Sequence, residues 1–465
     1  NTSIVGGNNP LVLIDGISSD LVTLSTIYPS DIEKFEVLKN AAETAQFGSR
    51  GAAGVIVVTT KKGREGKFQI SYDGNYGWES VYRNLEMLSA QEYIAEAQRL
   101  GVPYINGGYN ENYTDLPLRE GSINNHHVAF SGGTSESNYR ASLAYTGRET
   151  VIRHIGYDNF VAKLDFTQLA FDNYLVIDFG VFGSSQDNRN IADPQALFYG
   201  AATQNPTLPS AWNGSGWTTN PTANQIARLR IKDEVFNQNL NSHLSLKLRL
   251  LRELTLKVLG TYSFTSIENA QFFPTWTFAQ GMAMRKEEKH KDWLLNAALD
   301  YAKTFGIHQL DLRLLSEYQA NSIRSFGTTV RGFNNNDIGY DNLALGALRP
   351  YGGTSSYNET ARLASFLFSL KYRLYNKYTL SVSSRWDGSS LVGKDNTWGV
   401  FPSVSADWNL KAEPFLRNYL PISQFNLRIG YGRSGNLNGI SAYNALQRLE
   451  PQGIVAYHNT PTVAL

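Results

Sequence analysis

The feature that most constrains the fold of this 465-residue chain is the alternation of apolar and polar residues. The clearest runs are "FQISYDGNYGW" at Phe68, "NYRASLAY" at Asn138, "HLSLKLRL" at His243, "YTLSVSSRW" at Tyr378 and "FNLRIGYGR" at Phe425. Successive side chains of a β-strand point to opposite faces, so each run predicts a strand with one apolar and one polar face. About a dozen such runs predict a chain made mainly of β-strands.

Short and long connections alternate between these runs. The sequence predicts short turns at 132–138, 170–173, 251–253 and 375–377, a moderate link at 148–157, and long insertions at 79–124, 184–240, 265–290 and 320–361. Bacterial outer-membrane barrels combine short periplasmic turns with long extracellular loops, whereas a soluble sandwich has no reason to sort its loops in this way. The alternation therefore favours a membrane barrel over a soluble β protein.

The two faces of the predicted strands support the same interpretation. Mid-strand cations fall on the polar faces only: Lys247, Arg249, Lys371, Arg373, Arg385 and Arg428. Aromatic residues near the strand ends fit the interfacial girdles of a barrel: Trp78, Tyr145, Trp293, Tyr301, Trp386 and Trp408. No apolar run approaches the roughly 18 residues of a transmembrane helix. If the chain meets a membrane, it does so as a closed barrel, which satisfies the backbone of every strand.

The charge and cysteine content exclude several kinds of partner and site. Lys and Arg number 42 against 41 Asp and Glu, so the net charge of +1 implies no nucleic-acid partner. The absence of cysteine excludes disulfides, cysteine metal sites and thiol nucleophiles.

Three glycines at three-residue spacing, Gly48, Gly51 and Gly54, raise the question of a phosphate-binding loop. Such a loop follows a strand and opens a helix. Here a helix-like segment, 32–46, precedes the glycines and an apolar strand, 55–60, follows them. We therefore expect a tight helix-to-strand turn without bound phosphate, in which Gly48 caps the helix in a left-handed conformation. For Arg50, an ion pair with the wall of the predicted barrel is favoured over contact with a substrate, because an unpaired buried charge is costly.

No catalytic or metal site is predicted. The sequence contains neither G-x-S-x-G nor H-E-x-x-H. His126 and His127 are adjacent and would point to opposite faces of a strand, so they cannot bind one metal ion together. We expect them to lie in a girdle or a loop, and we expect no cofactor.

Several motifs, taken together, resemble the SusC/RagA family of TonB-dependent outer-membrane transporters. They are "PLVLIDG" at Pro10, "DIEKFEVLKNAAETAQFGSRGAAGVIVVTTKKG" at Asp31, "SGGTSESNYRASLAY" at Ser131, "RWDGSSLVGKDNTWGVFPSVSADW" at Arg385 and "LRIGYGRSGNLN" at Leu427. They follow the family's order over nearly the whole chain. Phe47 and Ala53 depart from the usual Tyr and Asn, and the Pro that commonly follows the IDG segment is missing.

The resemblance implies an all-β transmembrane barrel with a small α+β plug domain at the N-terminus. It places the C-terminal part of the plug at 1–66 and the N-terminal part of the barrel at 67–465. The family barrel has about 22 antiparallel strands, so the chain would supply a partial set. The resemblance assigns the plug motif to Asp15, Gly16, Glu36, Lys39, Gly48, Arg50, Gly51 and Gly54.

The function that the resemblance implies is TonB-dependent import of oligomeric nutrients across the bacterial outer membrane. Its expected partners are a SusD-like surface lipoprotein, outer-membrane lipid, and TonB acting through a segment missing from this chain. Family members import oligosaccharides or peptides. The aromatic loops favour oligosaccharides slightly, with candidate substrate contacts at Tyr199, Trp212, Trp217, Phe273 and Trp276. For the individual side chains, folding the loops or anchoring them at the interface is favoured over substrate contact. A structural or adhesive barrel and a diffusive porin are the alternatives, and a plug argues against both.

Overall fold

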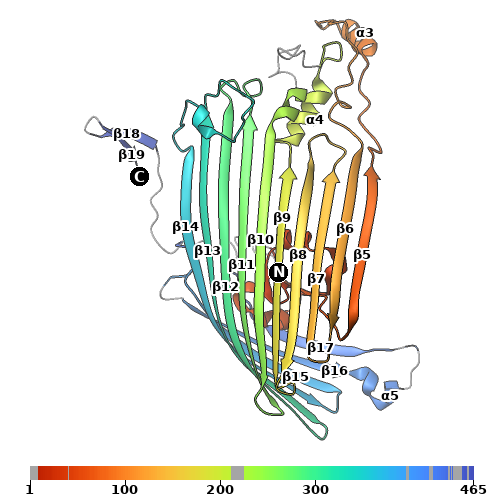
Figure 1. Cartoon of the computed structure of the whole chain (residues 1–465), viewed down its shortest axis with the longest axis vertical. Coiled ribbons are helices and arrows are strands. Elements are labelled where there is room, and N and C mark those ends of the chain that lie inside the picture. The colour runs from red at the N-terminus through yellow and green to blue at the C-terminus, as the bar shows by residue number, and fades with distance from the viewer. Residues whose placement is uncertain are drawn as a thin grey trace.

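The computed structural model describes residues 9–39, 41–210, 225–393, 397–417, 421, 423–437, 440, 442–443, 453–457 and 460–464. A tall, curved wall of strands dominates the molecule, and the N-terminal segment lies against the inner side of its lower half (Figure 1).

The wall is one antiparallel sheet of 13 strands, in which each strand pairs with its neighbours in the chain. The strands are β5 (Gly66–Glu79), β6 (Gly121–Gly133), β7 (Ser137–Glu149), β8 (Gly156–Ala170), β9 (Leu175–Arg189), β10 (Lys232–Arg249), β11 (Leu254–Phe273), β12 (Met282–Phe305), β13 (His308–Arg331), β14 (Thr354–Leu374), β15 (Tyr378–Ser389), β16 (Trp398–Asn409) and β17 (Asn426–Gly432). This sheet confirms the expectation of an all-β barrel wall built from about a dozen strands.

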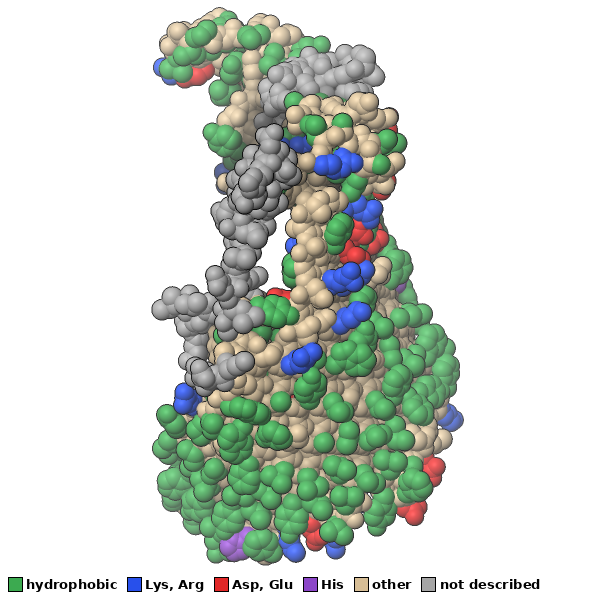
Figure 2. Space-filling view, turned by 90° about the vertical axis from the view of Figure 1, so that its left-hand side faces the viewer, with side chains coloured by type: hydrophobic (Ala, Val, Ile, Leu, Met, Phe, Trp, Pro, Cys, Tyr) green, Lys and Arg blue, Asp and Glu red, His purple; other side chains and the backbone are tan. Residues whose placement is uncertain are grey.

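The outer face of the wall carries an apolar band over its lower part (Figure 2). On β16 the exposed outward positions from Trp398 to Trp408 are all apolar. At about 3.4 Å per residue the two tryptophans are about 34 Å apart along the strand. A strand tilt of about 40° turns this into a height of about 26 Å, close to the roughly 25 Å apolar band of outer-membrane barrels. Trp398 and Trp408 thus mark the two edges of the band.

Above the band the strands continue with polar residues on both faces. In β12 the segment 285–292 consists only of charged residues and histidine, yet it pairs in register with β11 and β13. Three of the predicted long insertions are therefore shorter than expected: 184–240 is reduced to 190–231, 265–290 to 274–281, and 320–361 to 332–353. The alternation disappears there because both faces of the strand meet water, although the backbone pairing continues.

The four predicted short turns are all present, and a fifth hairpin at 306–307 was missed. The turn after β8 contains Phe171, Asp172 and Asn173 with φ of 53°, 52° and 67°. Asp and Asn tolerate this left-handed conformation better than most residues. The tight turns lie at one end of the wall and the other long connections at the opposite end, but the connection 410–425 between β16 and β17, which carries α5, lies at the end of the tight turns (Figure 1).

The N-terminal segment forms a four-stranded sheet of order β2-β1-β4-β3, here called the plug sheet. Its elements are β1 (Leu11–Ile14), β2 (Ile17–Ser19), α1 (Leu21–Thr26), η1 (Pro29–Asp31), β3 (Ile32–Leu38), α2 (Ala41–Thr44), η2 (Ala45–Arg50) and β4 (Val55–Thr60). The prediction of a helix over 32–46 was wrong for 32–38, which pairs with β4 as an edge strand. Phe35 and Val37 alternate with Lys34 and Glu36, and this short alternation was obscured by the charged residues around it.

One apolar cluster joins the plug sheet to the wall. Val12, Ile14, Ile27 and Val58 of the plug sheet pack with Ala144, Val161 and Phe182 of β7, β8 and β9. Val58 is fully buried between β1 and β3, as expected for a central strand. The inner face of the wall is therefore not wholly polar, because the plug sheet covers part of it.

A short link, residues 61–65, joins β4 directly to β5. The Lys61 amide donates to the Asp31 carbonyl at 2.7 Å, and the Lys62 ammonium contacts the Asp178 carboxylate on β9. A Cβ at Gly63 would fall on the backbone of Tyr139, so the link runs close against β7. The Lys62 contact and the close approach of Gly63 fix the link to the wall, whereas the Lys61 amide ties it to the N-terminal segment.

The connections at the other end of the wall carry α3 (Ala90–Leu100), α4 (Pro194–Thr203), η3 (Gln225–Arg230) and η4 (Leu343–Leu345). The remaining elements are η6 (Leu410–Ala412), α5 (Pro414–Arg417), β18 (Gly453–Tyr457) and β19 (Thr460–Ala464). Among the described residues, no helix has both the length and the apolar character needed to cross a membrane.

Candidate functional site

Polar side chains from the inner face of the wall meet the plug sheet in two buried clusters. The Arg50 cluster consists of Ser49, Arg50, Glu317, Gln319, Arg385 and Asp387. The Asp31 cluster consists of Tyr28, Ser30, Asp31, His127, Arg140 and Ser142. Each cluster joins one short stretch of the N-terminal segment to strands far away in the sequence.

Arg50 reaches from the end of η2 to β13. Its Nη2 donates to Glu317 Oε1 at 2.6 Å and its Nη1 to Gln319 Oε1 at 2.7 Å. Burial lowers the pKa of the Arg50 guanidinium, and the neighbouring Glu317 carboxylate opposes this effect. Arginine remains charged in proteins, so the cluster holds a buried ion pair between the two sheets. The expected ion pair of Arg50 with the wall is thus present.

A second arginine, Arg385 on β15, shares the same carboxylate. Its Nη2 donates to Glu317 Oε1 at 2.8 Å and its Nε to Asp387 Oδ1 at 2.7 Å. The other carboxylate oxygen of Asp387 accepts hydrogen bonds from the Ser49 amide and hydroxyl, both at 2.9 Å. Two cations and two carboxylates therefore balance in one buried network across the interface.

Gly48 lets this network form. Its φ of 57° is positive, as predicted, but its ψ of −127° is not that of a left-handed helix cap. A Cβ there would overlap the Asp387 carboxylate and lie 2.8 Å from Arg385 Cδ. Gly51, with φ of −87°, is the C-cap residue instead, and Gly54 has φ of 97°. The prediction that Gly48 is the helix cap was wrong, because its conformation is set by the close approach to β15.

The glycine stretch nevertheless connects a helical segment to β4, as predicted. The helical part is short, consisting of α2 and η2. The C-terminal end of this segment carries orphan carbonyls rather than amides. Nothing in this arrangement resembles a phosphate cradle, in which helix N-terminal amides face the anion.

The Asp31 cluster holds the other side of the plug sheet. The Asp31 carboxylate accepts from Arg140 Nη2 and from the Ser142 hydroxyl, both at 2.7 Å, and lies 3.1 Å from His127 Nε2. Burial raises the pKa of Asp31, but the hydrogen bonds from Arg140 and Ser142 outweigh it and hold the pKa below its usual value. The carboxylate is therefore stabilised in its ionised form.

Sequence reasoning identified no member of this cluster, and its expectation that His127 lies in a girdle or a loop was wrong, because the side chain is buried between β6 and the N-terminal segment. Its ring stacks on Tyr28 with 4.7 Å between centroids and is 1% exposed. His126 points the other way and pairs with the Tyr72 hydroxyl at 2.8 Å, so the two rings do lie on opposite faces of β6. The only available signal was the position of His127 on the lumenal face of a strand, which does not reveal what covers that face.

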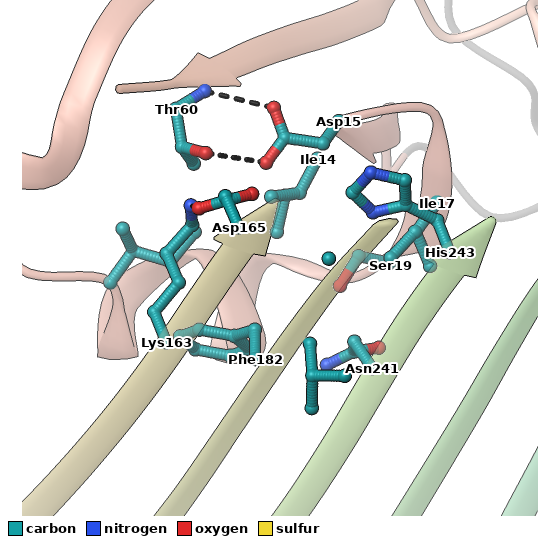
Figure 3. Close-up of a pocket in the computed structure, with 13 residues that line it drawn as sticks. Ile14, Asp15, Ile17, Ser19, Thr60, Lys163, Asp165, Phe182, Asn241 and His243 are labelled. Carbon is teal, nitrogen blue, oxygen red and sulfur yellow. Dashed lines mark hydrogen bonds and ion pairs between the residues drawn. The ribbon is translucent and has the colours of Figure 1, made fainter. Parts of the chain in front are cut away.

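A small cavity of about 20 Å³ lies between the plug sheet and β8 to β10 (Figure 3). Asp15 on one side accepts from the Thr60 amide at 2.9 Å and from the Thr60 hydroxyl at 2.5 Å. On the other side the Lys163 ammonium lies against the Asp165 carboxylate, with His243 nearby. A space of this size holds about one water molecule, so it suits a hydration site rather than an organic ligand.

The remaining residues of the plug motif lie apart from the two clusters. Gly16 has φ of 86° in the β1–β2 turn, where only Gly is unstrained. Glu36 is exposed and pairs with Lys34 at 2.8 Å. Lys39 follows β3 and is exposed. The structure thus brings together only Arg50 and the glycines around it from the predicted motif.

The candidate aromatic contacts lie in the long connections. Tyr199 is 73% exposed on α4. Phe273 ends β11, and Trp276 follows it in the loop to β12. Trp212 and Trp217 lie outside the described residues. Within the described ranges no group of His, Asp and Glu has the geometry of a metal site.

Comparison with known proteins identifies the small sheet. Residues 2–55 match the family model of the TonB-dependent Receptor Plug Domain. The TonB-dependent receptor SusC of Bacteroides thetaiotaomicron is 29% identical over 94% of this chain and 47% of its own length. The TonB-dependent receptor P3 of Formosa agariphila is 29% identical over 96% of this chain and 46% of its own. The chain spans about half the length of these relatives.

Solved structures show the same fold. The structure of the RagAB peptide transporter superposes with a TM-score of 0.81 at 17% identity, over 100% of this chain and 58% of that one. The unliganded ferric citrate transporter FecA gives 0.58 at 11% identity, over 94% and 56%. The relatives are receptors and transporters rather than enzymes, in agreement with the prediction. In its plug sheet, its antiparallel wall and these relatives, the chain is similar to the SusC and RagAB TonB-dependent transporters, and its fold is that of a plugged β-barrel of the bacterial outer membrane.

Proposed function

We propose that the chain is part of a TonB-dependent importer that carries oligomeric nutrients across the outer membrane. The observation that carries this proposal is the attachment of the plug sheet to the lumenal face through the Arg50 and Asp31 clusters. A folded sheet in the lumen obstructs free diffusion, so passage requires work on the plug. Energy transmitted by TonB would supply that work, and the protein itself then needs no cofactor or nucleotide.

For the substrate we propose oligosaccharides ahead of peptides. Exposed aromatic side chains at the extracellular end, such as Tyr199, offer flat apolar surfaces on which sugar rings stack. The SusC relative supports a nutrient importer, while the fold is shared with a structure described as a peptide transporter. The proposed partners are a SusD-like lipoprotein over the extracellular connections, and TonB.

The division into a plug at 1–66 and a barrel from 67 onwards is part of the same proposal. The change from the plug sheet to the wall between Thr60 and Gly66 supports it. The plug-motif residues of the Arg50 cluster would hold the plug in its resting position, and the aromatic residues of the loops would contact the substrate.

Growth of a strain lacking the gene tests this function. We expect loss of growth on at least one oligosaccharide as sole carbon source, normal growth on its monosaccharide, and rescue by the wild-type gene. Loss confined to peptide media would reverse the substrate assignment. Unchanged uptake of every glycan and peptide, combined with lost surface adhesion, would favour the structural barrel.

A further inference from the structure

We propose that the outer face of β12, β13 and β14 binds the phosphate groups of an anionic lipid headgroup in the outer leaflet. The site consists of Lys291, Arg324 and Arg362, here called the phosphate patch. Each cation lies on a different one of three adjacent strands, and each is exposed. The patch lies on the face of the wall opposite to the one that contacts Arg50.

The strand register places all three side chains on the outer face. Ala320 on β13 pairs with both Trp293 and Arg362, and Lys291 and Arg324 lie two and four residues from these positions along their strands. Residues directly across, or an even number of residues apart, share one face of a sheet. Trp293 is 58% exposed on this face, whereas Glu317 and Gln319 of β13 point inward to Arg50.

The patch lies at the upper edge of the apolar band. On β12 the outward positions Trp293 and Leu295, both 58% exposed, lie immediately below Lys291. On β14, Phe366 is 50% exposed and lies four residues below Arg362. Figure 2 shows Lys and Arg side chains along the upper margin of the apolar surface on this side. The three cations are therefore at the height where lipid headgroups meet the barrel.

These three cations differ from their outward-facing neighbours in lacking a counter-charge. Lys289 pairs with Glu287 at 2.6 Å, Arg285 Nε donates to Glu268 at 2.7 Å, and Arg189 pairs with Asp158 at 2.7 Å. For Lys291, Arg324 and Arg362 no ion pair occurs with any residue that the structure describes. The patch is thus a local excess of positive charge in a region where other charges are neutralised.

The spacing suits one phosphorylated headgroup. With strands about 4.8 Å apart and about 6.8 Å per two residues, the Cα atoms of Lys291 and Arg324 are about 8 Å apart, and those of Lys291 and Arg362 about 12 Å. Long side chains can converge over these distances, and guanidinium groups bind phosphate with two parallel hydrogen bonds. Ser322 and Thr360 pair with one another between the cations and add two hydroxyl donors.

A lipid explains the position of the patch better than a protein partner at the loops. The apolar band directly below would accommodate acyl chains while the cations bind the headgroup. β12 and β13 continue upward beyond the patch to Met282 and Arg331, so the patch lies well below the loops that a lid would contact. A ligand with phosphate above and hydrocarbon below fits this arrangement.

The test measures lipid binding to the full-length protein in detergent by native mass spectrometry. The probes are phosphorylated lipid A and the same lipid after removal of its phosphates. Each cation near a membrane surface contributes roughly five-fold to binding, so the triple variant Lys291→Gln, Arg324→Gln, Arg362→Gln is expected to bind the phosphorylated lipid on the order of 100-fold more weakly. Its binding of the dephosphorylated lipid should not change. Arg324→Gln alone should lose about five-fold.

A matched variant removes the same charge elsewhere. Lys67→Gln, Arg252→Gln, Lys303→Gln neutralises three exposed cations near the turns at the opposite end of the wall and should bind the phosphorylated lipid like the wild type. Heat-dependent gel mobility checks that each barrel is folded. Equal lipid binding by the triple variant and the wild type would overturn the proposal. Displacement of the lipid by excess inorganic phosphate alone would overturn the lipid assignment, because it would show an anion site without a hydrocarbon contribution.

Discussion

The guanidinium of Arg50 and the carboxylate of Glu317 lie 2.6 Å apart although they are separated by 267 residues and belong to different sheets. Their side chains are only 15% and 7% exposed. Arg385 contacts the same carboxylate oxygen, so one Glu317 side chain serves two arginines. A substitution of Glu317 therefore removes a hydrogen-bond partner from Arg50 of the plug and from Arg385 of the wall.

Glu317→Gln should loosen the plug without unfolding the barrel. The substitution leaves two buried guanidinium groups with one carboxylate less, and breaking a buried pair in this way costs about 3–5 kcal/mol. We expect the plug to become cleavable by protease at a lower denaturant concentration than in the wild type. Asp311→Asn, an exposed change on the same strand, is the control and should leave cleavage unchanged. Equal protection in both variants would show that the cluster does not retain the plug.

Asp31 should make plug retention depend on pH in the acid range. Its folded pKa is lowered, so its stabilising contribution is complete above the unfolded value of about 3.9 and is lost as the pH falls through the folded value. We expect protease protection of the plug to weaken below about pH 4. In Asp31→Asn protection should be weaker at neutral pH and nearly constant over that acid range. Arg140 and His127 contact this carboxylate, Asp73 contacts His127, and all three remain in the variant, so an unchanged pH profile would show that Asp31 is not the source of the pH dependence.

Gly48→Ala should destabilise the plug more than an alanine at an open position. The new Cβ would overlap the Asp387 carboxylate, and the φ of 57° is itself unfavourable for alanine. A residue forced into such a region costs about 1–3 kcal/mol. Gly260→Ala is the matched control, since a Cβ there meets nothing within 4 Å. Gly51→Val should also assemble poorly, because its Cβ would lie 2.5 Å from the Thr44 carbonyl oxygen. Yields of folded barrel and urea midpoints give the comparison.

The apolar band predicts that the free-energy cost of placing an arginine on the outer face depends on its depth in the membrane. Val404 lies between Trp398 and Trp408 on the outward face of β16, near the middle of the band. Val404→Arg should reduce the free energy of unfolding in lipid by about 2–4 kcal/mol, and Trp398→Arg at the edge by about 0–1 kcal/mol. Reversible unfolding in bilayers measures both. Equal costs at the two positions would contradict the placement of the band.

Within the membrane the strands were predictable because lipid on one side and the plugged lumen on the other impose a two-residue period. Above the band the same strands gave no such signal, since residues 285–292 of β12 meet water on both faces. The edge strand β3 was mistaken for a helix for a related reason: its alternating Phe35 and Val37 lie among charged residues. The alternation of apolar and polar residues in a strand reflects whether each face contacts lipid, protein or water. It does not show whether the backbone is paired with a neighbouring strand.

The candidate site was predictable only in part. The ion pair of Arg50 followed from the cost of burying an isolated charge, but its partner did not, because Glu317 looks like any polar residue on a lumenal face. Asp387 and Arg385 lie within a motif quoted for the family, yet their contact with Ser49 depends on how the two sheets meet. The burial of His127 was not predicted, because the side chain is covered by a segment about 100 residues away and the sequence around His127 gives no sign of that contact.

The link at 61–65 limits what any opening of the lumen can look like. Six residue steps, from Thr60 to Gly66, span at most about 20–22 Å when fully extended. The link is a covalent tether between β4 and β5, and β5 is itself a strand of the wall. While the contact between Lys62 and Asp178 holds, β4 can move very little relative to the wall, and β1 and α1 can move farther than β4. Force applied to the chain on the N-terminal side of the plug would therefore detach the plug elements from the wall in sequence order. The last element to detach would be β4, which directly precedes the tether.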